Sequence, residues 1–200
     1  MINGYDGFKT QPMFTGRQKL PAGVYVAKVY DVELQTYNAG KPNESQQLII
    51  SFDIHEGEHK GFFKKDWDTA DPANRKWRGT YRLWIPKGDG SEADKTTRRI
   101  FEQAMWAFEE SNAQFHWAWD EKQLKGLFVG VKFRNKEYDE FNGAPAGWTT
   151  ECCGLADIPS VRAGKVRTPK DKPLEKKPVA APVVVNTGFT DVDDSELPFF

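Results

Sequence analysis

The sequence predicts a mainly β fold with one main helix and a C-terminal tail that lacks regular structure. Several short runs alternate between apolar and polar residues, which is the period of a β-strand. Residues 94–112 instead carry apolar side chains at helical spacing, and beyond residue 163 Pro, Lys and Val accumulate without any period. A chain of 200 residues has room for one ordinary domain with tails.

The first predicted strand follows Leu20 and covers residues 24–34, and its second half places Tyr30, Val32 and Leu34 on one face. Turn-forming residues 38–43 separate it from a second strand at 47–54, so we expect an antiparallel hairpin with a longer loop. Further strands are predicted at residues 62–67, 76–85, 127–134 and 147–155.

The helix prediction for residues 94–112 depends on one apolar stripe, with Asp94 as the expected N-cap. The stripe consists of Ile100, Phe101, Ala104, Met105 and Phe108. A helix between the third and fourth main strands is the order found in an OB barrel. We therefore expect an OB-like barrel of five to six strands, while a split barrel would give much the same pattern.

Four regions follow from composition. Residues 1–19 are expected to form an N-terminal arm, 20–163 the β-rich core, 164–188 a flexible linker and 189–200 an acidic tip. Residues 160–178 hold seven Lys or Arg against two acids, whereas residues 186–200 hold four acids and no base. The net charge is only -1, so any affinity for nucleic acid must come from local patches.

The sequence gives little support for catalysis. His55 and His59 match the H-E-x-x-H pattern, but that zinc motif requires a helix and here it follows a predicted strand and contains Gly57. Cys152 and Cys153 are adjacent and lack zinc-ligand spacing, so a buried pair at the end of a strand in a reducing compartment is expected. We expect no enzyme activity, no cofactor, no metal, no membrane contact and a cytoplasmic protein.

Basic residues interleave with aromatic residues in three segments. A single strand of DNA exposes phosphates and unstacked bases, so its binder needs both residue types along one groove. The candidate nucleic-acid-binding residues are Phe63, Lys64, Lys65, Trp67, Lys76, Arg78, Arg82, Trp84, Lys132, Arg134 and Lys136. Taken singly, each segment is better explained as a half-buried strand with solvated cations, and it is the combination of three such segments in an OB-like order that favours binding. In the strand at 76–85, Trp84 shares a face with Arg78 and Arg82, so it is the better candidate for stacking on a base, unless a bulge near Gly79 inverts the phase.

The tip places acidic residues directly before an apolar end. Its candidate partner-binding residues are Asp191, Asp193, Asp194, Glu196, Leu197, Pro198, Phe199 and Phe200. This pattern resembles the tip of bacterial and phage single-stranded DNA-binding proteins, which end in acids, an aliphatic residue, Pro and Phe. The resemblance implies that the tip docks in pockets on replication, recombination and repair proteins. Phe200 is an extra residue relative to that family, which leaves open whether Phe199 or Phe200 is the anchor.

Residues 18–175 are similar to a phage- or prophage-encoded family of such proteins. The similarity rests on residues 20–23 (LPAG), 62–65 (FFKK), 109–112 (EESN) and 169–174 (PKDKPL). It implies sequence-independent binding of single-stranded DNA in phage replication or recombination, in the host cytoplasm. Two other functions stay open, an inhibitor or interaction module that binds replication or defence proteins, and a recombination annealing factor. Homo-oligomerisation is also open.

Overall fold

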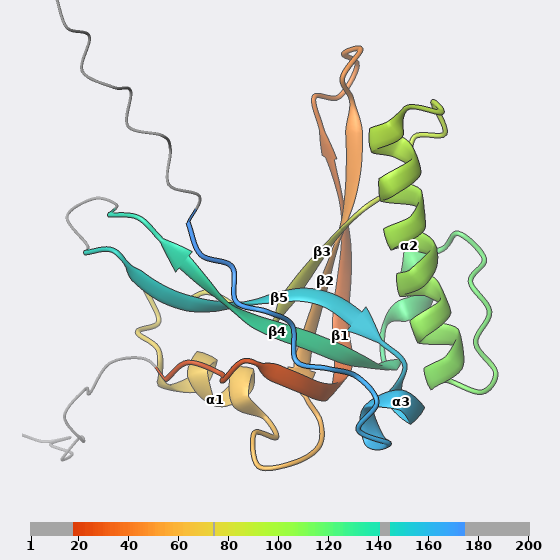
Figure 1. The fold of residues 1–200 in the computed structure, drawn as a ribbon. Coiled ribbons are helices and arrows are strands. Elements are labelled where there is room, and N and C mark those ends of the chain that lie inside the picture. Colours follow the sequence, from red (N-terminus) through yellow and green to blue (C-terminus); the bar gives the residue numbers. More distant parts are fainter. Residues whose placement is uncertain (1–17, 74, 141–144, 175–200) are drawn as a thin grey trace, which may run out of the picture.

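The computed structural model describes residues 18–73, 75–140 and 145–174, and it is mainly β (Figure 1). The strands are β1 (Gly23–Tyr37), β2 (Ser45–Ile54), β3 (Thr80–Trp84), β4 (Phe128–Tyr138) and β5 (Gly147–Ala156). All neighbouring strands are antiparallel, and they form one sheet in the order β3-β2-β1-β4-β5. The helices are α1 (Phe62–Thr69), α2 (Glu92–Ser111) and α3 (Ile158–Arg162), with one 3-10 turn at Glu121–Leu124.

Two long hairpins give the sheet its shape. The predicted β1–β2 hairpin is confirmed, and Figure 1 shows it pointing away from the β4–β5 hairpin. The register of β1 against β2 shifts between Val29 and Asp31, so Tyr30 bulges out and is exposed. The bulge removes Tyr30 from the face that the sequence assigned to Tyr30, Val32 and Leu34. Val32 and Leu34 still share one face, where Val32 packs on the core and Leu34 is exposed.

The sheet is open, and the expected barrel closure is not found within the described residues. Strands β3 and β5 are its two edges, and they come within 8 Å of each other between Cα atoms without forming a ladder. Side chains of both strands, together with Phe62 and Phe63 of α1, line a cavity between them. A hydrogen-bonded closure would require the two backbones to meet where these side chains lie.

The prediction of a third strand at residues 62–67 was wrong, because these residues form helix α1. The buried Asp53 carboxylate accepts the backbone N–H groups of Phe63 (2.9 Å) and Lys64 (3.0 Å), which satisfies two donors of the first turn. Lys64 pairs with Asp68 one turn later at 2.6 Å. Adjacent apolar and adjacent basic residues fit a helix better than they fit strict alternation.

Strand β3 is shorter than the predicted strand at 76–85, since its pairing with β2 begins at Thr80. A Cβ on Gly79 would lie 2.2 Å from the carbonyl oxygen of Phe52, so only glycine permits this close approach. The phase predicted for the remaining strand is confirmed: Tyr81 and Leu83 are buried, while Arg82 and Trp84 are exposed.

Helix α2 begins two residues before the predicted range, and its N-cap is Ser91 rather than Asp94. The Ser91 hydroxyl accepts the backbone N–H of Asp94 at 3.1 Å. The Asp94 carboxylate instead accepts the backbone N–H groups of Lys87 (2.6 Å) and Gly88, which fixes the loop after β3. Ile100, expected in the apolar stripe, is exposed, whereas the other four stripe residues are buried.

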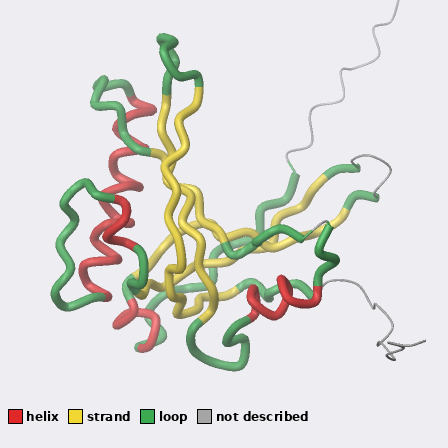
Figure 2. Tube along the Cα trace, turned by 180° about the vertical axis from the view of Figure 1, so that it is seen from behind, coloured by secondary structure: helices red, strands yellow, loops and turns green. Residues whose placement is uncertain are grey.

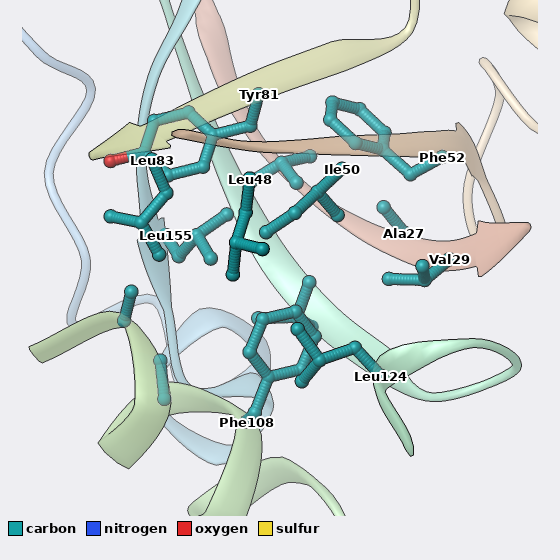
Figure 3. Close-up of a cluster of buried hydrophobic side chains, with 14 of the residues drawn as sticks. Ala27, Val29, Leu48, Ile50, Phe52, Tyr81, Leu83, Phe108, Leu124 and Leu155 are labelled. Atoms are coloured by element: carbon teal, nitrogen blue, oxygen red, sulfur yellow. The ribbon is translucent and has the colours of Figure 1, made fainter. Parts of the chain in front are cut away.

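The core lies between the concave side of the sheet and α2. Figure 3 shows Phe108 of α2 directed toward Leu48, Ile50 and Val29 of the sheet, with Leu124 beside it. Figure 2 shows that the long helix α2 and the short helix α1 cover different parts of the sheet. Helix α1 covers the part of the sheet around Phe52. The ring of Phe63 in α1 contacts that of Phe52 edge-on, with the ring centroids 5.9 Å apart.

The chain after α3 returns along β4. Lys172 forms a parallel bridge with Lys136: its N–H donates to the carbonyl of Asn135 (2.8 Å), and its carbonyl accepts from the N–H of Glu137 (2.9 Å). Residues 171–174, which belong to the predicted linker, therefore lie against the sheet. The arm up to residue 17, the rest of the linker and the acidic tip lie outside the described residues.

Candidate nucleic-acid interface

A groove of about 350 Å³ runs between the two edges of the open sheet. Arg78, Thr80 and Arg82 line it on the β3 side, and Thr150, Glu151 and Cys152 line it on the β5 side. Leu20, Phe62, Phe63 and Phe133 complete its lining. The groove thus has an apolar base with arginines at one edge, and its volume lies in the usual range for ligand sites.

Trp84 stands at the end of β3 beside Tyr37 of β1. The two ring centroids are 5.3 Å apart at an interplanar angle of 50°, and Trp84 keeps 45% of its surface exposed. Gln47 of β2 pairs with Trp84 of β3 on one side and with Gln35 of β1 on the other, so it lies between the strands that carry Trp84 and Tyr37. Its buried amide oxygen accepts from the Tyr37 hydroxyl (3.2 Å) and from Arg82 Nη1 (3.4 Å). Trp84, Tyr37 and Arg82 are therefore held as one cluster.

Arg82 is free to meet a phosphate. No carboxylate in the described ranges forms an ion pair with it, and its one hydrogen bond, to Gln47, is long. Arg78 is less free, because its Nε lies 3.6 Å from the Asp66 carboxylate of α1. This ion pair brings α1 next to β3. Strand β1 carries Asp31 and Glu33 on the face that Arg82 shares, so positive charge gathers at the sheet edge rather than across the sheet.

Glu151 already holds two of the predicted cations. Its carboxylate accepts from Arg134 Nη2 at 2.6 Å and lies 3.1 Å from Lys136 Nζ. Partial burial alone would raise the pKa of Glu151, but the hydrogen bonds from Arg134 and Lys136 outweigh it and hold the pKa below its ordinary value. Lys132, on the same face of β4, has no ion-pair partner among the described residues.

The remaining predicted residues belong to α1 and the loop after it, and one of them is corrected. Phe63 is buried among Phe52, Phe62 and Phe133, so it forms part of the core and cannot stack on a base. Trp67 is half-buried, and Arg75 lies over its ring at 4.7 Å. Lys64 is paired with Asp68, whereas Lys65 and Lys76 are exposed and have no ion pair in the described ranges.

The sequence did not single out Tyr37, Gln47 or Glu151 as parts of this site. Tyr37 ends a strand just before a turn, a position at which a tyrosine carries no special signal. Gln47 and Glu151 are polar residues in strands, and only the strand register shows which arginines they contact. Pairing across strands depends on tertiary structure, so the local sequence could not reveal these contacts.

The H-E-x-x-H segment is a loop between β2 and α1, as predicted. The His55 ring packs on Phe128 (4.8 Å), and the His59 ring packs edge-on against Tyr25 (5.6 Å), so the two imidazoles have different neighbours. No group of three metal-ligating side chains occurs in the part of the chain that the structure describes. Cys152 and Cys153 are free thiols within β5 rather than at its end, and burial raises the pKa of Cys152 to about 12.

No protein-family model and no curated protein matches this chain. Among the described residues, no helix combines the length and the apolarity needed to cross a bilayer. The eight partner-binding residues predicted in the acidic tip, from Asp191 to Phe200, lie outside the described ranges.

Proposed function

We propose that this protein binds single-stranded DNA without sequence preference, at the edge of the sheet formed by β3. The observation that carries the proposal is the exposed Trp84, which shares the outer face of β3 with Arg82. Arg82 lines the groove between β3 and β5 and has no ion-pair partner among the described residues. An indole face offers a stacking surface to any base, and a guanidinium offers hydrogen-bond donors to any phosphate. Neither group distinguishes one base from another.

The strand order supports the finer assignment to an OB-like fold. An OB barrel places its helix between the third and fourth strands and is commonly only partly closed. Here α2 lies between β3 and β4, and the open side lies between β3 and β5. Oligonucleotides on OB folds contact the face of the second and third strands, together with the loops after the first and fourth strands. Trp84, Arg82 and Gln47 belong to β2 and β3.

The pairing state of the cations predicts where the DNA backbone runs. Arg82, Lys65, Lys76 and Lys132 carry positive charge without an ion-pair partner among the described residues, so each can meet a phosphate without first losing a carboxylate. Arg134 and Lys136 would have to exchange Glu151 for a phosphate. We therefore place the main phosphate contacts on the β3 side of the groove.

The wider role is proposed from the sequence of the tail. Acidic residues followed by Leu-Pro-Phe-Phe after a linker suit recruitment of replication or recombination proteins, as in the family that this tip resembles. Phage replication or recombination is then the process in which the protein acts. The protein itself needs no catalytic group or cofactor for this role.

The test is a titration of the full chain with an oligo-dT strand, followed by tryptophan fluorescence. We expect saturable quenching with oligo-dT and weak binding to a duplex of equal length. The logarithm of the binding constant should fall linearly with the logarithm of the salt concentration, with a slope of about 0.7 for each phosphate contact on single strands. Equal affinity for duplex and single strand would contradict the proposal. The absence of both binding and quenching would favour a module that binds protein. Faster pairing of complementary strands would add the annealing function.

A further inference from the structure

A second hollow, of about 450 Å³, lies beside α2, away from the groove between β3 and β5. Phe101, Met105 and Trp106 of α2 form one wall. The opposite side is formed by Trp117 and Trp119 of the loop after α2 and by residues 86–88 of the loop after β3. We call it the aromatic pocket.

The rings of the aromatic pocket form flat, accessible walls. Trp119 stacks on Phe101 with centroids 5.6 Å apart and an interplanar angle of 11°, and Trp117 meets both rings at 5.9 and 6.1 Å. Trp119 is 70% exposed and Trp106 53% exposed. Contact between water and so much indole surface is unfavourable, so binding of an apolar ligand that covers these rings would be stabilised by the burial of apolar surface.

Two local features indicate that this arrangement is not simple packing. Trp119 adopts φ 60°, a left-handed conformation that is rare for a bulky residue and is concentrated at ligand-binding sites. The indole N–H of Trp117 is buried and has no acceptor within the described residues.

The charges around the aromatic pocket argue against a phosphate backbone. Lys87 and Arg98 are balanced by Glu102 and Glu109. Arg98 Nε donates to Glu102 at 2.7 Å, and Glu109 accepts the backbone N–H of Trp117 at 2.9 Å. A neutral lining with flat aromatic walls suits an apolar peptide that contains proline, because a proline-containing segment is already extended and its ring packs on aromatic faces.

We propose that the aromatic pocket binds the segment 197–200, Leu-Pro-Phe-Phe, of this same chain. Only 23 positions separate Leu174 from Leu197, a span of about 75 to 80 Å when extended and about 25 Å on average when flexible. A compact core of about 150 residues has a radius of gyration of about 15 Å, so the segment can reach any part of the core surface.

This inference does not depend on DNA binding. It has a consequence for the tail, because a tip held in the aromatic pocket is hidden from partner proteins and must leave the pocket before it can bind them. The core and a partner protein therefore compete for the tip. The linker keeps the effective concentration of the tip near its own core high, which favours the docked state.

The test uses the full chain labelled with ¹⁵N and follows the indole N–H resonances, assigned by single Trp→Phe substitutions. We expect the double variant Phe199→Ala/Phe200→Ala to shift the resonances of Trp106, Trp117 and Trp119 and to leave that of Trp148 in place. Phe189→Ala, which removes a phenyl ring from the same tail before the tip, is the matched control and should shift none of the three.

The same spectra separate the other occupants. Docking within one chain predicts shifts that do not change over a twentyfold dilution, whereas shifts that disappear on dilution would place the tip in a second copy and overturn the proposal. Shifts at Trp84 instead of the pocket residues, or no shift at all, would also overturn it. In a Trp119→Ala or Trp106→Ala background, the tip variant should shift the remaining pocket resonances less, and two backgrounds guard against a loss of folding in one.

Discussion

The outer face of β3 and the aromatic pocket beside α2 both present exposed tryptophan, but they differ in what surrounds the indole rings. On β3, Trp84 shares an exposed face with Arg82, which has no ion pair with a described carboxylate. At the pocket, the nearest guanidinium, Arg98, is already bonded to Glu102. The charge of the neighbouring residues, rather than the aromatic residue itself, therefore decides whether a surface suits a nucleic acid or an apolar peptide.

The largest effect should come from the base of the groove. Phe63→Ala is expected to lower the free energy of unfolding by about 3 to 5 kcal/mol, because it leaves a cavity among Phe52, Phe62 and Phe133. DNA affinity measured on the folded fraction should hardly change. Chemical denaturation and titration on one sample would check both, and a stable variant with lost affinity would return Phe63 to the binding surface.

The comparison is tested most directly by two exposed tryptophans. Trp84→Ala should weaken single-stranded DNA binding by about 1 to 3 kcal/mol through lost stacking. Trp106→Ala removes an indole of similar exposure from the aromatic pocket and should leave DNA affinity unchanged. Oligo-dT titrations of both variants provide the measurement. Equal losses for the two would mean that the groove has no special role.

Substitution of Arg82 or Arg98 tests which of the two arginines contacts a DNA phosphate. Arg82→Ala should reduce the log-log salt slope by about 0.7, because one phosphate contact is lost. Arg98→Ala should leave the slope as it is, since Arg98 lies at the neutral pocket and is bonded to Glu102. Titrations at several salt concentrations give the slopes, and a slope that changes only for Arg98 would reverse our assignment of the two sites.

Substitution of Glu151 should have a smaller effect on DNA binding, and it should strengthen the binding rather than weaken it. Glu151→Gln should free Arg134 and Lys136 and raise DNA affinity at low salt, with a slope larger by at most about 0.7 for each freed cation. Glu102→Gln, which frees Arg98 at the pocket, is the control and should leave DNA affinity unchanged. Salt-dependent titration would show the difference, and a fall in affinity for Glu151→Gln would argue against competition for these cations.

The same variant has a pH signature in stability. Because the folded-state pKa of Glu151 lies below its unfolded value of about 4.3, the pairing stabilises the fold above that pH and is lost as pH falls through the folded-state pKa. The difference in unfolding free energy between wild type and Glu151→Gln should therefore be present near neutral pH and disappear in acid. A difference that persists unchanged in acid would assign it to packing instead.

The smallest effect concerns the tail. Removing residues 191–200 should leave single-stranded DNA affinity unchanged or slightly raised at low salt, because an acidic segment can only compete with phosphates for the cations of the groove. Recruitment of a replication protein should be lost in the same variant, as a pull-down with that protein would show. A clear fall in DNA affinity would mean that the tail takes part in binding DNA.

Local patterns predicted the hairpin, the main helix and the phase of β3, because each depends on periodicity within one segment. The placement of Arg82 and Trp84 on one exposed face was correct for this reason. Residues 62–67 were assigned to a strand because six residues are too few to distinguish the two periods. The buried Asp53 that holds the start of α1 belongs to the preceding strand.

Patterns within single segments were sufficient to predict that the chain is mainly β and which side chains of β3 face solvent. They also show that basic and aromatic residues are interleaved in three segments. Tertiary structure alone decided that the sheet stays open between β3 and β5, that Phe63 lies in the core, and that Glu151 occupies Arg134 and Lys136. The physical reason is that periodicity is set within a segment, whereas burial, closure and ion pairing depend on which distant segment becomes the neighbour.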